Sequence, residues 1–118
     1  MIKSLHHSAI IVSSEAGIDF YKTLGFSEEQ RIDRGYDQIV WLSGYGEKLE
    51  IYIDGTHPAR VTNPEALGLR HLAFEVDNLE GERERLKSYH PGEIVQREDG
   101  VRVFFVKDPD GLPIEMRE

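Results

Sequence analysis

The chain has 118 residues, enough for one domain with a modest buried core, and its 39% hydrophobic and 31% charged residues are typical of a soluble globular protein. No apolar run is long enough for a membrane span, and a net charge of −8 repels phosphate backbones and anionic lipids, so we expect neither nucleic acid nor membrane as a partner. The absence of cysteine excludes disulfides and thiolate metal sites and, together with an N-terminus that lacks a secretory signal, favours a cytoplasmic location.

The first half of the chain is predicted to fold as a strand, a helix and three further strands. Residues 4–12 have the composition of a strand, and Ser13 and Ser14 cap a helix that ends at Gly25. Turn residues separate the later strands, and residues 54–69 contain the prolines and glycines of an irregular linker. The three later strands are expected at about 26–33, 36–43 and 47–53.

The same order of elements returns after the linker. Residues 70–76 read as a strand, Asp77 and Asn78 offer a cap, and an amphipathic pattern predicts a helix over 79–89. Three more strands are expected at about 93–97, 101–107 and 112–117. We therefore predict an α+β fold in which two tandem βαβββ modules form a cupped mixed sheet with helices on its outer face. The modules cover about 1–53 and 70–118 of a single domain that spans 1–118.

Matching segments support the repeat. The segment His-Ser-Ala-Ile-Ile-Val at 7–12 corresponds to His-Leu-Ala-Phe-Glu-Val at 71–76, and Leu-Glu-Ile-Tyr at 49–52 corresponds to Ile-Glu-Met-Arg at 114–117. The histidines are 64 residues apart (7 to 71) and the glutamates are 65 apart (50 to 115). A duplication with one inserted residue accounts for both spacings.

The repeated histidines and glutamates are candidates for a shared metal site. Strand alternation places Leu, Ile and Phe on the face under the helices and the histidines and glutamates on the opposite, concave face. Each such residue alone is more often an ordinary solvated side chain, but the symmetric pairing favours a single site. Two imidazoles and two carboxylates suit Zn or Ni, and also Co, Fe or Mn, and leave a coordination position open for a substrate. The predicted ligands are His7, Glu50, His71 and Glu115.

A resemblance to a known family covers nearly the whole chain and rests on the segments at 7–12, 20–26, 68–77 and 108–115, of which Gly-Leu-Arg-His-Leu-Ala-Phe-Glu-Val-Asp and Asp-Pro-Asp-Gly-Leu-Pro-Ile-Glu are the most specific. On these segments the chain resembles the glyoxalase/bleomycin-resistance/dioxygenase group, also called the vicinal oxygen chelate superfamily. It is similar above all to short bacterial glyoxalase I-like proteins. A fourth ligand at Glu50 resembles glyoxalase I, whereas dioxygenases and fosfomycin-modifying enzymes use two histidines and one glutamate.

This resemblance implies a metal-dependent lyase or isomerase that moves a proton on a 2-hydroxy-carbonyl or thiohemiacetal substrate, as in the formation of lactoylglutathione. Either Glu115 or Glu50 would act as the base. The alternative is a non-catalytic protein that sequesters a small molecule, as bleomycin-resistance proteins do. The resemblance also implies a homodimer, with each site built within one chain or across two.

Two positions depart from the glutathione-binding pattern of glyoxalase I. Ile11 stands where an arginine is usual, and Asp54 stands where an asparagine is usual. The substrate is therefore expected to be a small molecule other than the glutathione adduct, such as an adduct of a different thiol. Among the other histidines, His6 is expected to face away from His7, and His57 and His90 are expected to be solvated loop residues.

Overall fold

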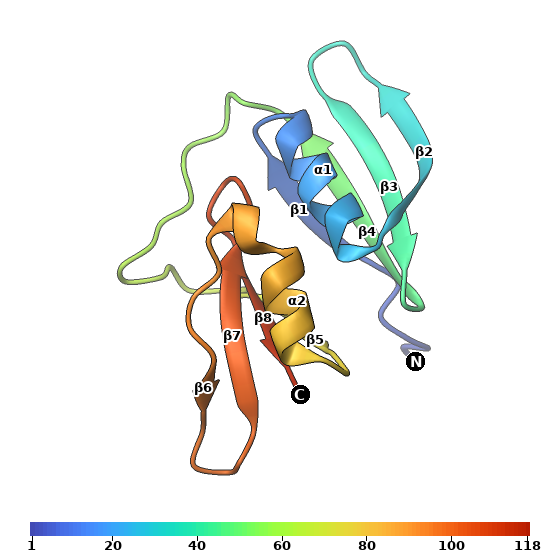
Figure 1. Cartoon of the computed structure of the whole chain (residues 1–118). Coiled ribbons are helices and arrows are strands. Elements are labelled where there is room, and N and C mark those ends of the chain that lie inside the picture. Colours follow the sequence, from blue (N-terminus) through green and yellow to red (C-terminus); the bar gives the residue numbers. More distant parts are fainter. The chain divides into compact units, whose positions relative to one another are not determined.

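The computed structural model describes residues 1–118, which form two compact units, Met1–Pro58 and Ala59–Glu118. Each unit has the order βαβββ and holds a four-stranded mixed sheet, with one helix beside it (Figure 1). The α+β class and the repeated βαβββ order predicted from the sequence are confirmed. None of the helices has both the length and the apolar character needed to cross a membrane.

In the first unit the sheet has the strand order β1-β4-β3-β2. The first strand pairs in parallel with the last, and the other neighbours are antiparallel. The elements are β1 (Ser8–Val12), α1 (Glu15–Leu24), β2 (Ser27–Asp33), β3 (Gln38–Gly44) and β4 (Glu47–Ile53).

Helix α1 forms where the sequence supplies both caps. The Ser14 hydroxyl accepts a hydrogen bond from a backbone N–H of the first turn, and Gly25 ends the helix with φ of 114°, a conformation that costs glycine little. The helix buries its apolar face, including Ile18 and Phe20, against the sheet. Gly17 allows the close approach, because a Cβ there would lie 2.5 Å from the Cβ of Val12.

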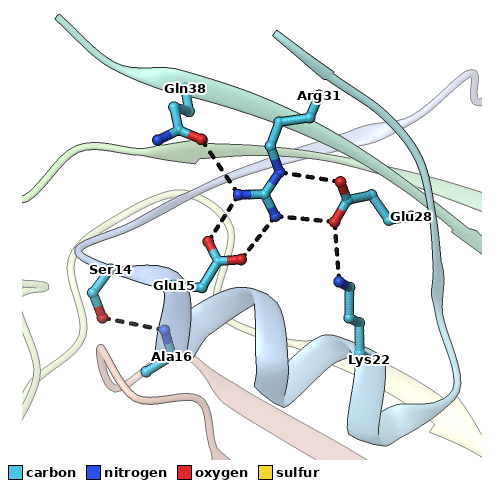
Figure 2. A network of polar contacts seen from close by, with 7 residues as sticks. All are labelled: Ser14, Glu15, Ala16, Lys22, Glu28, Arg31 and Gln38. Carbon is cyan, nitrogen blue, oxygen red and sulfur yellow. Dashed lines mark hydrogen bonds and ion pairs between the residues drawn. The ribbon is translucent and has the colours of Figure 1, made fainter. Parts of the chain in front are cut away.

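A polar network fastens both ends of α1 to β2 (Figure 2). The Arg31 guanidinium donates to both carboxylate oxygens of Glu15, at 2.8 and 3.0 Å, and to both of Glu28, at 2.9 and 3.1 Å. Lys22, near the end of α1, forms a 3.0 Å ion pair with Glu28. The Arg31 and Lys22 hydrogen bonds lower the pKa of Glu28 to about 2, and the Arg31 hydrogen bond also lowers that of Glu15.

The second unit repeats this topology with strand order β5-β8-β7-β6. β5 and β8 are parallel, and the other pairs are antiparallel. The core is formed by Leu79 and Leu86 from the helical segment together with apolar residues of β7 and β8. The elements are β5 (Leu72–Glu75), α2 (Leu79–Arg85), the 3-10 turn η1 (Lys87–Tyr89), β6 (Val95–Gln96), β7 (Arg102–Lys107) and β8 (Pro113–Arg117).

Four predicted elements are clearly shorter in the structure. The helix predicted over 79–89 ends at Arg85 and continues as the turn η1, because His90 adopts a left-handed conformation and the Pro91 that follows cannot extend a helix. The strand predicted over 93–97 keeps only Val95 and Gln96 in regular pairing. The strands predicted to begin at 4 and 70 begin at residues 8 and 72, so His7 and His71 precede their strands.

Candidate metal centre

In the first unit, His7 and Glu50 form a close pair. The parallel register sets Ala9 beside Glu50, and His7, two residues before Ala9, keeps the same side of the sheet although it lies just outside β1. His7 Nε2 is 3.5 Å from Glu50 Oε1. Trp41, opposite Glu50 on β3, packs edge-on against the His7 ring with 4.9 Å between ring centroids.

In the second unit, His71 and Glu115 form the equivalent pair. Ala73 lies beside Glu115 in the parallel register, and His71 precedes Ala73 by two residues. His71 Nε2 is 3.6 Å from Glu115 Oε1. Phe105, opposite Glu115 on β7, packs edge-on against His71 with ring centroids 5.2 Å apart. Each predicted histidine is thus paired with its predicted glutamate by the same local geometry.

The surroundings of Glu50 leave one carboxylate oxygen without a hydrogen bond. The Tyr52 hydroxyl donates to Oε1 at 3.0 Å, and His7 Nε2 approaches the same oxygen, whereas Oε2 accepts no hydrogen bond from the protein. The hydrogen bond to Glu50 raises the pKa of Tyr52, because the phenolate could not donate it and would face a carboxylate. Oε2 is therefore the oxygen that no protein hydrogen bond holds, in a side chain that is 15% exposed.

The surroundings of Glu115 are strongly basic. Its side chain is only 3% exposed, and a carboxylate buried to that extent needs a cationic partner. Arg97 Nη2 donates to Oε1 at 2.9 Å, and Arg117 Nη1 lies 3.5 Å from Oε2. Arg70 Nη1 lies 2.9 Å from Nδ1 of His71. The sequence analysis did not identify these three arginines; alternation along β8 places Arg117 beside Glu115, whereas no sequence signal points to Arg97.

Both paired histidines direct Nε2 to their glutamate and use Nδ1 elsewhere. His7 Nδ1 is 2.8 Å from His6 Nδ1, and an N–H on His7 there would leave the Nε2 lone pair for a metal. Arg70 can only donate to Nδ1 of His71, so a neutral His71 ring carries its proton on Nε2. Before Nε2 could bind a cation, His71 would have to give up its hydrogen bond from Arg70 and carry its proton on Nδ1. The expectation that His6 faces away from His7 is wrong, because residue 6 lies before β1 and strand alternation does not apply.

Comparison with known proteins identifies the family. Residues 4–116 match the model of the glyoxalase/bleomycin resistance protein/dioxygenase superfamily. The chain belongs to this superfamily. YwkD of Bacillus subtilis (strain 168) is 39% identical over 100% of this chain and 98% of its own, and YaeR of Escherichia coli (strain K12) is 35% identical over 99% and 97%. The crystal structure of a glyoxalase family protein from Enterococcus faecalis has 37% identity and a TM-score of 0.91 and covers 98% of each chain.

The donor set of this superfamily member fits a borderline divalent ion. Two ligands about 2.1 Å from a metal and about 115° apart are about 3.5 Å from each other, which is close to the Nε2–Oε1 separations of 3.5 and 3.6 Å in the two pairs. Neither unit by itself gathers three or more such ligand side chains. Each unit supplies one pair, and a four-ligand centre formed from both pairs stays a prediction.

Proposed function

We propose that the protein is a metal-dependent, glyoxalase I-like lyase or isomerase that moves a proton on a 2-hydroxy-carbonyl or thiohemiacetal substrate. The ligands would be His7, Glu50, His71 and Glu115, with Zn or Ni as the cation. The observation that carries the proposal is the equivalence of the two His–Glu pairs, with Nε2 to Oε1 distances of 3.5 and 3.6 Å. A bound divalent ion would polarise the substrate carbonyl and stabilise the negative charge that develops when the neighbouring carbon loses its proton.

Glu50 is the better base of the two glutamates. Its Oε2 accepts no hydrogen bond from the protein, and the Tyr52 hydroxyl donates to the other oxygen, so the carboxylate is oriented with one oxygen free of hydrogen bonds to take and return a proton. Both oxygens of Glu115 have guanidinium neighbours, which favour the ionised carboxylate and disfavour its protonation during a reaction. Trp41 packs on the His7 ring and fixes its position beside Glu50.

A substrate other than the glutathione adduct is supported by the two departures noted in the sequence. Ile11 is on the same side of the sheet as Glu50 and is exposed, so it offers no charge to a carboxylate. Asp54 accepts hydrogen bonds from the backbone N–H and the hydroxyl of Thr56. Its pKa is lowered by these bonds, so it is an anion that would repel glutathione carboxylates.

Metal content tests the ligand set. Elemental analysis of protein purified without chelator should find close to one divalent ion per chain, and His71→Ala or His7→Ala should abolish that occupancy. His90→Ala is the matched control, because His90 lies in a loop outside both pairs and should leave the occupancy unchanged. Full metal content in His71→Ala would refute the ligand set.

Proton transfer is tested in deuterated water. The metal-loaded protein would be incubated with methylglyoxal and either glutathione or another low-molecular-weight thiol, and solvent deuterium at the product carbon would reveal the transfer step. Glu50→Gln should remove deuterium incorporation, and Glu115→Gln should lower it less if metal is retained. Tight binding of an unchanged ligand, with no exchange above a metal-only blank, would establish a sequestering protein of the bleomycin-resistance type instead.

We also propose a homodimer in the cytoplasm. Sedimentation should give a dimer, and mixing the metal-dead chains His7→Ala and Glu115→Ala distinguishes two arrangements of the centre. Recovered metal binding after subunit exchange requires pairs from different chains to meet. No recovery, with exchange demonstrated by mass-labelled chains, requires the centre to lie within one chain.

A further inference from the structure

Three arginines of the second unit surround the His71–Glu115 pair. Arg97 and Arg117 contact the two oxygens of the Glu115 carboxylate, and Arg70 contacts His71. The carboxylate carries one negative charge against three guanidinium groups that remain protonated. This concentration of positive charge occurs in a chain whose net charge is −8.

The first unit lacks this excess charge although its fold is the same. Tyr52 takes the place of Arg117, since each lies two residues after the glutamate of its pair. Arg34 opens the hairpin after β2 as Arg97 opens the hairpin after β6. Arg34, however, is neutralised by two hydrogen bonds to Asp37, at 2.6 and 2.7 Å. The charge around the pair is therefore a property of the second unit alone.

The hydrogen bonds to Glu115 occupy few of the N–H donors of Arg97 and Arg117. Each guanidinium has five N–H donors, and each makes one hydrogen bond to the carboxylate. Their side chains are 44% and 40% exposed, so the other donors reach solvent. Glu75 lies beside Arg117 in the strand register but forms no ion pair with it. Two planar groups with unused donors at a buried carboxylate can bind a second anion from solution.

We propose that Arg97 and Arg117 bind an oxyanion of the substrate, a carboxylate or a phosphate group. This inference rests on the proposed function, because it assigns the site an anionic substrate and orients that substrate's charged end to the second unit. A divalent cation held by Glu115 would add positive charge beside the arginines, and an anionic ligand would relieve the resulting repulsion. The arginines should therefore couple the binding of anion and metal.

Titration calorimetry at low ionic strength tests the site directly in the metal-free protein. The probes are pyruvate, inorganic phosphate and the uncharged hydroxyacetone. Pyruvate or phosphate should bind, and hydroxyacetone should not. Arg117→Gln should lower the affinity for the anion at least tenfold, and Arg117→Lys should lower it less because the charge remains. Arg85→Gln is the matched control: it removes the same charge from α2, where Arg85 pairs with Glu82, and should leave the affinity unchanged. Whichever of pyruvate and phosphate binds more tightly identifies the anionic group.

The readouts separate this inference from the proposed function. Equal anion affinity in the wild type, Arg117→Gln and Arg85→Gln overturns the oxyanion site, whatever the metal content. Absence of metal from the wild type overturns the proposed function, while the titration of the metal-free protein still decides the oxyanion site. Nickel titrated into the wild type should bind more tightly with the preferred anion present, and this gain should vanish in Arg117→Gln. Circular dichroism confirms that each variant is folded.

Discussion

Replacing Arg97 with glutamine should destabilise the metal-free protein. The substitution leaves Glu115, with a side chain 3% exposed, without the guanidinium 2.9 Å from its Oε1. Removing one partner of a buried ion pair costs about 3–5 kcal/mol, but Arg117 still contacts the other oxygen and Arg97 itself is half-exposed. We therefore expect a loss of about 1–3 kcal/mol, the range for leaving a buried acceptor without its hydrogen-bond partner. An unfolding entropy of about 2.1 cal/mol/K per residue gives about 0.25 kcal/mol/K for 118 residues, so the melting temperature should fall by about 4–12 °C.

The assay is a thermal melt of chelator-treated protein, followed by circular dichroism. Arg102→Gln is the control, because Arg102 pairs with the exposed carboxylates of Glu80 and Glu118 and its replacement should lower the melting temperature much less. In a Glu115→Gln background the further loss from Arg97→Gln should shrink, because no buried charge remains to be compensated. A melting temperature of Arg97→Gln equal to that of the wild type, or an equal loss in both backgrounds, would refute the reasoning.

Three further outcomes follow from the packing and the polar network. The folded-state pKa of Glu28 is lowered to about 2, so the stability that its ionised carboxylate contributes is fully present above its unfolded pKa of about 4.5 and is lost as the pH falls toward 2. Urea unfolding of Arg31→Gln should therefore show a shallower loss of stability over this range than the wild type. The difference should be less than about 1 kcal/mol, because solvent screens the network. Gly17→Ala should lower the urea midpoint despite the better helix propensity of alanine, because its Cβ would lie 2.5 Å from that of Val12. Such overpacking costs about 1–3 kcal/mol. An unchanged midpoint would contradict the close contact of α1 with Val12. Asn78→Ala should cost about 1 kcal/mol in the same assay, because the Asn78 side chain accepts a hydrogen bond from a backbone N–H in the first turn of α2, and no loss would show that the cap is dispensable.

The sequence predicts most of the fold because hydrophobic periodicity reports burial directly. Leu49 and Ile51 are buried and Glu50 is not, as strand alternation requires. The internal repeat identified the candidate ligands, which periodicity alone could not. The two histidines and the two glutamates are separated by nearly the same number of residues, and this indicates equivalent positions in the two modules. The close approach of each histidine to its glutamate follows from the parallel pairing of first and last strands.

The contacts that the sequence could not predict come from irregular backbone. Arg97 reaches Glu115 from the end of a two-residue strand, where no periodicity fixes the direction of the side chain. His6 meets His7 because the chain before β1 is not a strand. The helical segment that follows α2 ends at the left-handed conformation of His90, which is uncommon for residues other than glycine and which no periodicity in the sequence indicates. Pattern reasoning is therefore weakest at the residues that set the charge of the candidate site.

The parallel pairing of first and last strands has a consequence for protease resistance. In each unit the histidine precedes the first strand and the glutamate lies in the last, so a cation bound by such a pair would join the two ends of the module. A partly folded module without its last strand in place lacks the His–Glu pair. The binding of a cation would therefore stabilise only the completely folded module. A cation would then suppress the local openings through which proteases cut, and chelation would expose these modules to digestion well below their melting temperature.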